Sequence, residues 1–96
     1  MNWRVSIRPA AESDLRQARD WYEEQRAGLG EEFLLSIADA MIRLEESPER
    51  VPAYYRDFRR LLTERFPYKI FYRIEKDAVI VFRVLHVARD HVRELK

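Results

Sequence analysis

The chain contains no cysteine, and only two glycines and two histidines occur among its 96 residues. Without cysteine it can form neither a disulfide nor a thiolate metal site, which is consistent with a reducing cytoplasm. No segment approaches the roughly 20 apolar residues that a membrane-spanning helix needs. The first residues also lack the apolar core of a signal peptide. We therefore expect a cytoplasmic protein without a membrane partner.

Neither sign of charge is in large excess. The chain has 18 Lys and Arg against 17 Asp and Glu, a formal net charge of +1. Global charge therefore gives no reason to expect nucleic-acid binding, and a basic patch must come from local segregation. Apolar residues make up 47% of the chain, which is enough for one core shared by two layers. We expect residues 1–96 to form a single domain.

The first half of the chain predicts a strand followed by two helices. Trp3, Val5 and Ile7 alternate with polar residues, which indicates a short half-buried strand ending at Pro9. Two amphipathic helices then follow from Pro9, separated by the glycines at 28 and 30. Their apolar positions are Ala11, Leu15, Ala18 and Tyr22 in the first, and Phe33, Leu34, Ile37, Ala38, Met41 and Leu44 in the second. The short link predicts an antiparallel helical hairpin that ends at Ser47-Pro48.

The second half predicts a loop over 48–57 and three strands, at about 58–64, 67–75 and 79–87. The fold class is therefore α+β: an N-terminal strand, an antiparallel helical hairpin and a three-stranded antiparallel meander. A hairpin can cover only one face of so small a sheet, so the helices should pack on one face and leave the other open.

The turn near Lys76 decides which side chains of the last strand face the helices. A two-residue turn would place Arg83 opposite Ile70 on the core face, and a three-residue turn would direct Arg83 outward. We prefer three residues, because an unpaired buried arginine is costly. This choice puts Ile80, Phe82, Val84 and His86 on the core face. The open face then holds a basic set with apolar residues between: Arg59, Leu61, Arg65, Lys69, Phe71, Arg73, Val81 and Arg83.

Two segments resemble the RelE/ParE superfamily of toxins from bacterial type II toxin–antitoxin modules. They are Arg59-Arg60-Leu61-Leu62 leading into Phe66-Pro67-Tyr68-Lys69-Ile70-Phe71-Tyr72, and Val84-Leu85-His86-Val87-Ala88-Arg89-Asp90. They look more like the ParE, or plasmid-stabilisation, branch than the RelE branch. The resemblance implies a growth-inhibiting toxin, with a cognate ParD-like antitoxin as partner. ParE-branch members act on DNA gyrase and have no recognised nuclease site, whereas RelE-branch members cut mRNA on the ribosome.

A nuclease would need an acid, a base and cations around the phosphate. The candidate acid is His86, whose imidazole can exchange a proton near neutral pH. Arg83, Arg89 and Arg65 are the candidate phosphate ligands, and Glu64 is the candidate base. The alternative for His86 is a structural place at the core edge near Tyr68, which our register favours. The alternative for Arg89 is a salt bridge to Asp90 or Glu94.

The basic residues fit a binding surface better than a catalytic site. Arg59, Arg65, Lys69, Arg73, Arg83 and Arg89, with Phe71 as an apolar anchor, are the candidate residues for binding a target or an antitoxin. A disordered acidic antitoxin tail would cover both the open face and the sheet edge. We expect no metal and no cofactor. The leading hypothesis is a non-enzymatic gyrase inhibitor; the alternatives are a ribosome-dependent mRNA endonuclease and a degenerate toxin that only binds antitoxin.

Overall fold

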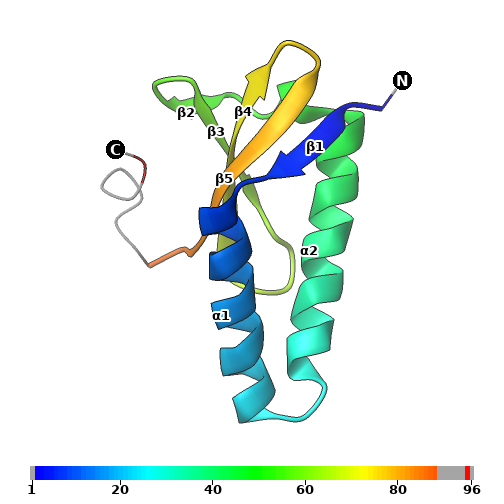
Figure 1. Ribbon diagram of the computed structural model, residues 1–96, viewed down its shortest axis with the longest axis vertical. Helices are drawn as coiled ribbons and strands as arrows, with labels where there is room; N and C mark the ends of the chain where they lie inside the picture. The colour runs from blue at the N-terminus through cyan, green and yellow to red at the C-terminus, as the bar shows by residue number, and fades with distance from the viewer. Residues whose placement is uncertain (1, 89–94, 96) are drawn as a thin grey trace.

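Figure 1 shows the computed structural model of the chain, which describes residues 2–88 and residue 95. Two long helices stand side by side against one small sheet. In chain order the elements are β1 (Arg4–Ile7), α1 (Pro9–Gln25), α2 (Leu29–Glu46), the 3₁₀-helix η1 (Pro48–Arg50), β2 (Ala53–Tyr55), β3 (Phe58–Leu62), β4 (Tyr68–Glu75) and β5 (Ala78–His86).

The five strands form one sheet in the order β1-β5-β4-β3-β2. β1 runs parallel to β5, and the other neighbours are antiparallel. The parallel pair is possible because the helical hairpin provides the long crossover from β1 back to the sheet. The predicted α+β architecture is confirmed. The predicted loop over 48–57 is wrong in part, since it contains η1 and the edge strand β2.

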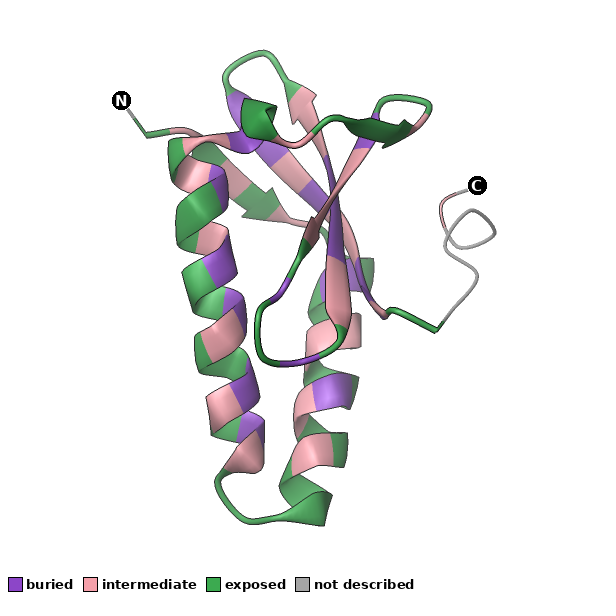
Figure 2. Cartoon of the chain, turned by 180° about the vertical axis from the view of Figure 1, so that it is seen from behind, coloured by how far each residue is buried: buried purple, intermediate pink, exposed green. Residues whose placement is uncertain are grey.

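The core lies between the helical hairpin and one face of the sheet. Each helix buries one side: Ala11 and Ala18 on α1, and a set at spacings of four and three on α2 that comprises Phe33, Ile37, Ala40 and Leu44. Figure 2 shows these buried positions along the inner sides of the two helices. Against them the sheet packs Ile70, Tyr72, Val79, Val81 and Val84. Removal of this apolar surface from water is the main force that holds the two layers together.

The loop between β3 and β4 also packs on the helices. The Phe66 ring lies between them, with its centroid 4.8 Å from that of Tyr22 on α1 and 5.4 Å from that of Phe33 on α2. The Thr63 hydroxyl is buried and donates a hydrogen bond to the Phe66 carbonyl. The loop is therefore a fixed part of the hairpin interface.

The turn between β4 and β5 differs from the prediction. Glu75 pairs directly with Ala78, so the turn contains two residues, and Lys76 has a positive φ of 57°. A β-bulge follows: Phe71 pairs with Arg83 while Tyr72 pairs with Val81, which leaves Phe82 as the extra residue. A bulge adds one residue to one strand and shifts the alternation beyond it.

This bulge corrects the predicted faces of β5. Val79 and Val81 face the helices, in place of Ile80 and Phe82. Beyond the bulge Val84 lies in the core, as predicted, and His86 pairs with Tyr68 at the edge of the core. The bulge lies where β1 ends: Arg8 N–H donates to the Val81 carbonyl at 3.0 Å, and the chain then enters α1.

Candidate functional site

The residues that the sequence placed together on the open face of the sheet are divided between its two faces and the loop that packs on the helices. Arg59 pairs with Tyr72 and Leu61 with Ile70, so both positions face the helices, as Val81 does. The predicted outward positions of Arg59, Leu61 and Val81 are therefore wrong. Arg59 Nη1 donates to the carbonyl of Val51 and, at 3.3 Å, to that of Glu49. This side chain holds the segment that follows α2.

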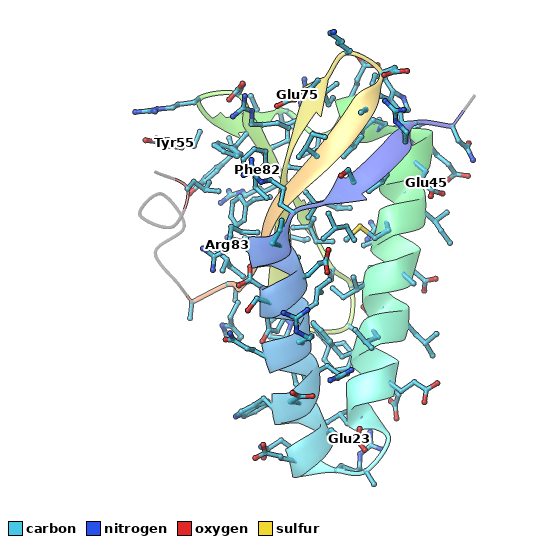
Figure 3. All side chains as sticks on the ribbon, in the orientation of Figure 1. Glu23, Glu45, Tyr55, Glu75, Phe82 and Arg83 are labelled. Atoms are coloured by element: carbon cyan, nitrogen blue, oxygen red, sulfur yellow. The ribbon has the colours of Figure 1, made fainter. Side chains whose placement is uncertain are left out.

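Arg83 is bound to α1. Its Nε and Nη2 donate to the two carboxylate oxygens of Asp14 at 2.8 and 2.9 Å. Asp14 Oδ2 also accepts the Val84 backbone N–H at 2.9 Å. The two side chains are only 22% and 9% exposed, so a bidentate pair is held away from most of the solvent. Figure 3 shows Arg83 beside the first turns of α1.

His86 lies at the core edge, at the end of β5. Its ring meets the Tyr68 ring edge-on at 5.4 Å between centroids, and its Nδ1 accepts the Ala88 backbone N–H at 3.1 Å. With Asp14 and Trp21, these rings line a hollow of about 230 Å³. These contacts hold the imidazole ring at the core edge near Tyr68, the place that the structural alternative gave it.

The other two candidates for phosphate chemistry lie against α2. Arg65 Nη1 forms an ion pair with Glu32 Oε1, and Glu64 Oε1 lies 4.0 Å from Arg43 Nη1. The hydrogen bond from Arg65 lowers the pKa of the Glu32 carboxyl, and the charge of Arg26 contributes further. Arg65 therefore belongs to the helix side of the molecule, not to the opposite sheet face as predicted.

Lys69, Phe71 and Arg73 do share the face turned away from the helices. They alternate with the core residues Ile70 and Tyr72 along β4. This face is not bare: Phe71 is fully buried, and the Tyr54 ring lies 6.0 Å from it. Burial lowers the pKa of the Lys69 ammonium, and the charge of Arg60 lowers it further.

The structure thus separates the predicted nuclease set. His86 and Arg83 lie beside α1, and Glu64 and Arg65 lie beside α2. Arg89 falls outside the described residues. Within residues 2–88 and 95, no group of three or more His, Cys, Asp or Glu side chains is placed to hold a metal ion. The same residues include no helix long and apolar enough to cross a membrane.

A family model described as the ParE toxin of the type II toxin–antitoxin system parDE matches residues 5–91. The chain belongs to the ParE toxin family. It is a type II toxin–antitoxin toxin of the ParE/RelE superfamily, as the two sequence segments indicated. A comparison with curated proteins gave no match.

Two solved structures share the fold of this ParE-family chain. One is from the chromosomal ParDE toxin–antitoxin system of P. aeruginosa: the TM-score is 0.80 at 18% identity, over 88% of this chain and 96% of that one. The other is from the RelBE2 toxin–antitoxin complex of Mycobacterium tuberculosis: the TM-score is 0.66 at 22% identity, over 90% of this chain and 99% of that one.

Sequence reasoning missed Asp14, which organises the β5 side of this ParE-family toxin. The signal was present, because Asp14 lies between Ala11, Leu15 and Ala18 on the apolar side of α1. A carboxylate at such a position needs a partner when it is buried. Arg83, which follows the bulge, supplies it. The sequence pattern of α1 alone could not show which cation would pair with Asp14.

Proposed function

We propose that this toxin acts by binding and inhibiting DNA gyrase, without chemistry of its own, and that a cognate antitoxin neutralises it. The observation that carries the proposal is the separation of the nuclease candidates among the described residues. Arg83 is bound by Asp14, Arg65 by Glu32, and His86 uses Nδ1 to accept the Ala88 N–H. General acid–base catalysis requires groups that converge on one reacting atom, and these do not.

The family match supports the choice of target, since ParE-branch toxins act on gyrase. The antitoxin partner is supported by the two structural neighbours, both described as parts of toxin–antitoxin systems. Inhibition by binding requires only a complementary surface. The Arg83–Asp14 pair and the buried face of β4 would serve it by holding the sheet rigid.

The test begins with co-expression of the chain and the product of the neighbouring reading frame. The complex is separated in denaturant, and the toxin is refolded and checked by circular dichroism. We expect it to inhibit supercoiling of relaxed plasmid by gyrase, and added antitoxin to restore supercoiling. A folded toxin that leaves supercoiling intact at a large molar excess over gyrase would refute the proposed target.

A second assay tests the alternative that the toxin is a ribosome-dependent mRNA endonuclease. The refolded toxin is added to ribosomes stalled on a defined message, and we expect the message to stay intact. Cleavage that is lost in His86→Ala would replace the gyrase proposal with the RelE-like activity. If neither assay responds and expression without the antitoxin leaves growth unaffected, the chain is a degenerate toxin.

A further inference from the structure

A hollow of about 430 Å³ lies on the sheet face turned away from the helices. Its lining includes two aromatic rings, Phe58 from β3 and Phe82 from the β5 bulge. The cations around them come from different parts of the chain, namely Arg8 before α1, Arg56 between β2 and β3, Arg73 on β4, and Arg83 on β5, which is paired with Asp14. We call this set the Arg–Phe hollow. In Figure 3 Tyr55 at the end of β2 and Phe82 on β5 lie on the same side of the ribbon.

The two rings of the hollow contact each other and two of its guanidinium groups. Phe58 and Phe82 meet edge to face, with centroids 5.0 Å apart and an interplanar angle of 87°. The Arg8 guanidinium lies over the Phe82 ring at 4.7 Å, and that of Arg73 at 5.2 Å. Stacking on an aromatic face fixes the plane of a guanidinium while its N–H edges stay available. Arg8 and Arg73 are therefore pre-organised donors beside the two phenylalanines, and the Arg56 guanidinium lies over the neighbouring Tyr55 ring at 5.2 Å.

The charge of the hollow is only partly balanced. Arg73 Nε lies 3.2 Å from Asp57 Oδ2, without the geometry of a hydrogen bond, and Arg73 Nη2 lies 3.5 Å from Glu75 Oε2. Arg8 and Arg56 are exposed and form no ion pair with the residues that the structure describes. Two cations beside two phenylalanines thus lack a counter-charge there, in a chain whose net charge is only +1.

From this geometry we propose that the Arg–Phe hollow binds a short acidic peptide segment of the partner protein. Carboxylates of the segment would contact Arg8 and Arg56, and an apolar side chain would pack against the partly exposed Phe82 ring, behind which Phe58 is buried. A planar guanidinium fork matches a carboxylate with two hydrogen bonds. The proposal rests on the proposed function only in taking the antitoxin as that partner; it does not depend on gyrase.

The chemistry of the hollow favours a peptide over a nucleic acid. Binding along a phosphate backbone needs a track of cations, whereas here the cations surround one hollow that also contains the Asp57 carboxylate. Isolated carboxylates next to an apolar side chain fit a single hollow of this kind better than a continuous phosphate backbone does.

The experiment measures binding of short fluorescent peptides that tile the antitoxin, by anisotropy, to the refolded toxin. The test variant is Arg8→Gln with Arg56→Gln. The control variant is Arg4→Gln with Arg16→Gln, which removes the same charge outside the hollow. We expect at least one acidic peptide to bind, the test variant to bind it roughly ten- to hundredfold more weakly, and the control to stay within about twofold. The same peptide with Asn and Gln in place of Asp and Glu should lose binding.

Phe82→Leu tests the contribution of the Phe82 ring to peptide binding. Circular dichroism must show that each variant is folded. The inference is overturned if no tiled peptide binds, or if the Arg8 and Arg56 double variant binds as tightly as the wild type. It is also overturned if a single-stranded RNA of equal charge displaces the peptide and depends on the same arginines. A toxin that binds the peptide in this way but leaves gyrase unaffected refutes the proposed target and supports the hollow.

Discussion

Asp14 and Arg83, which are far apart in the sequence, form the ion pair that joins α1 to the part of β5 that follows the bulge. β1 pairs with β5 only as far as Val81. Beyond it, Asp14 binds the Arg83 guanidinium through both carboxylate oxygens and also accepts the Val84 N–H at 2.9 Å. One carboxylate thus binds both a side chain and a backbone N–H of β5 just after the bulge.

Asp14→Asn should therefore destabilise the protein by about 2–3 kcal/mol, because a half-buried guanidinium loses its counter-charge. The free energy of unfolding is measured in urea. Asp20→Asn is the matched control on the same helix: Asp20 pairs with Arg19 at the surface, and its loss should cost less than about 0.5 kcal/mol.

A double-mutant cycle separates the pair from the Val84 contact. Arg83→Met combined with Asp14→Asn should show a coupling of about 1–2 kcal/mol, because the second change removes the charge that the first left unpaired. Purely additive effects would mean that Asp14 acts mainly through the Val84 N–H.

Gly30→Ala should destabilise the helical hairpin by about 1–3 kcal/mol, through overpacking. A Cβ at this position would lie 2.7 Å from the Arg19 carbonyl oxygen, which is backbone and cannot move aside. Gly28→Asn is the control: nothing lies within 4 Å of an added Cβ, and asparagine is strained less than most residues at the positive φ of 88°. We expect this variant to stay within about 1 kcal/mol of wild type by thermal unfolding. Equal losses for the two variants would contradict close helix packing at Gly30.

The element order was predictable because the hydrophobic periodicities are strong and Gly or Pro separates the segments. β2 was not predictable: Ala53–Tyr55 is a three-residue edge strand directly after Pro52, too short for any alternation to be visible. The β5 bulge was also hidden. Residues 79–82 are all apolar, so the pattern fits either face equally well.

The missed bulge explains why Val81, and not Phe82, faces the helices, whereas the wrong positions of Arg59 and Leu61 are a separate error in the face of β3. Register decides the face of each side chain, and one extra residue reverses the assignment on one side of it. The sequence also could not show that Arg59 would donate to the carbonyls of Val51 and Glu49, or that Arg8 and Arg56 would line one hollow with Phe58 and Phe82. These are tertiary contacts between segments distant in sequence.

Arg59→Ala should destabilise the protein by about 1–2 kcal/mol, because the carbonyls of Val51 and Glu49 lose their donor. It should also speed proteolysis within residues 48–52. The neighbouring Arg60 lies on the opposite face, 3.7 Å from the Tyr54 ring centroid, and Arg60→Ala should cost less than about 1 kcal/mol. Limited proteolysis and thermal unfolding compare the two variants. Wild-type stability in Arg59→Ala, together with weaker antitoxin binding, would restore the binding role that the sequence predicted.

Tyr72 should make the protein sensitive to alkaline pH. Its side chain is fully buried, its hydroxyl donates to the Pro48 carbonyl at 2.7 Å, and burial raises its pKa to about 12. In the unfolded chain the pKa is roughly 10. The stability from the neutral phenol is therefore complete below about pH 10 and is lost as pH rises through about 12.

Tyr72→Phe tests this relationship. At neutral pH it should cost about 1–2 kcal/mol, because the Pro48 carbonyl loses its donor. Since phenylalanine does not ionise, the variant's stability should fall less steeply than that of the wild type as the pH rises above about 10. Urea unfolding across this range measures the slope, with the exposed Tyr54→Phe as the control that keeps the wild-type slope. Parallel pH profiles for the wild type and Tyr72→Phe would show that another group governs alkaline unfolding.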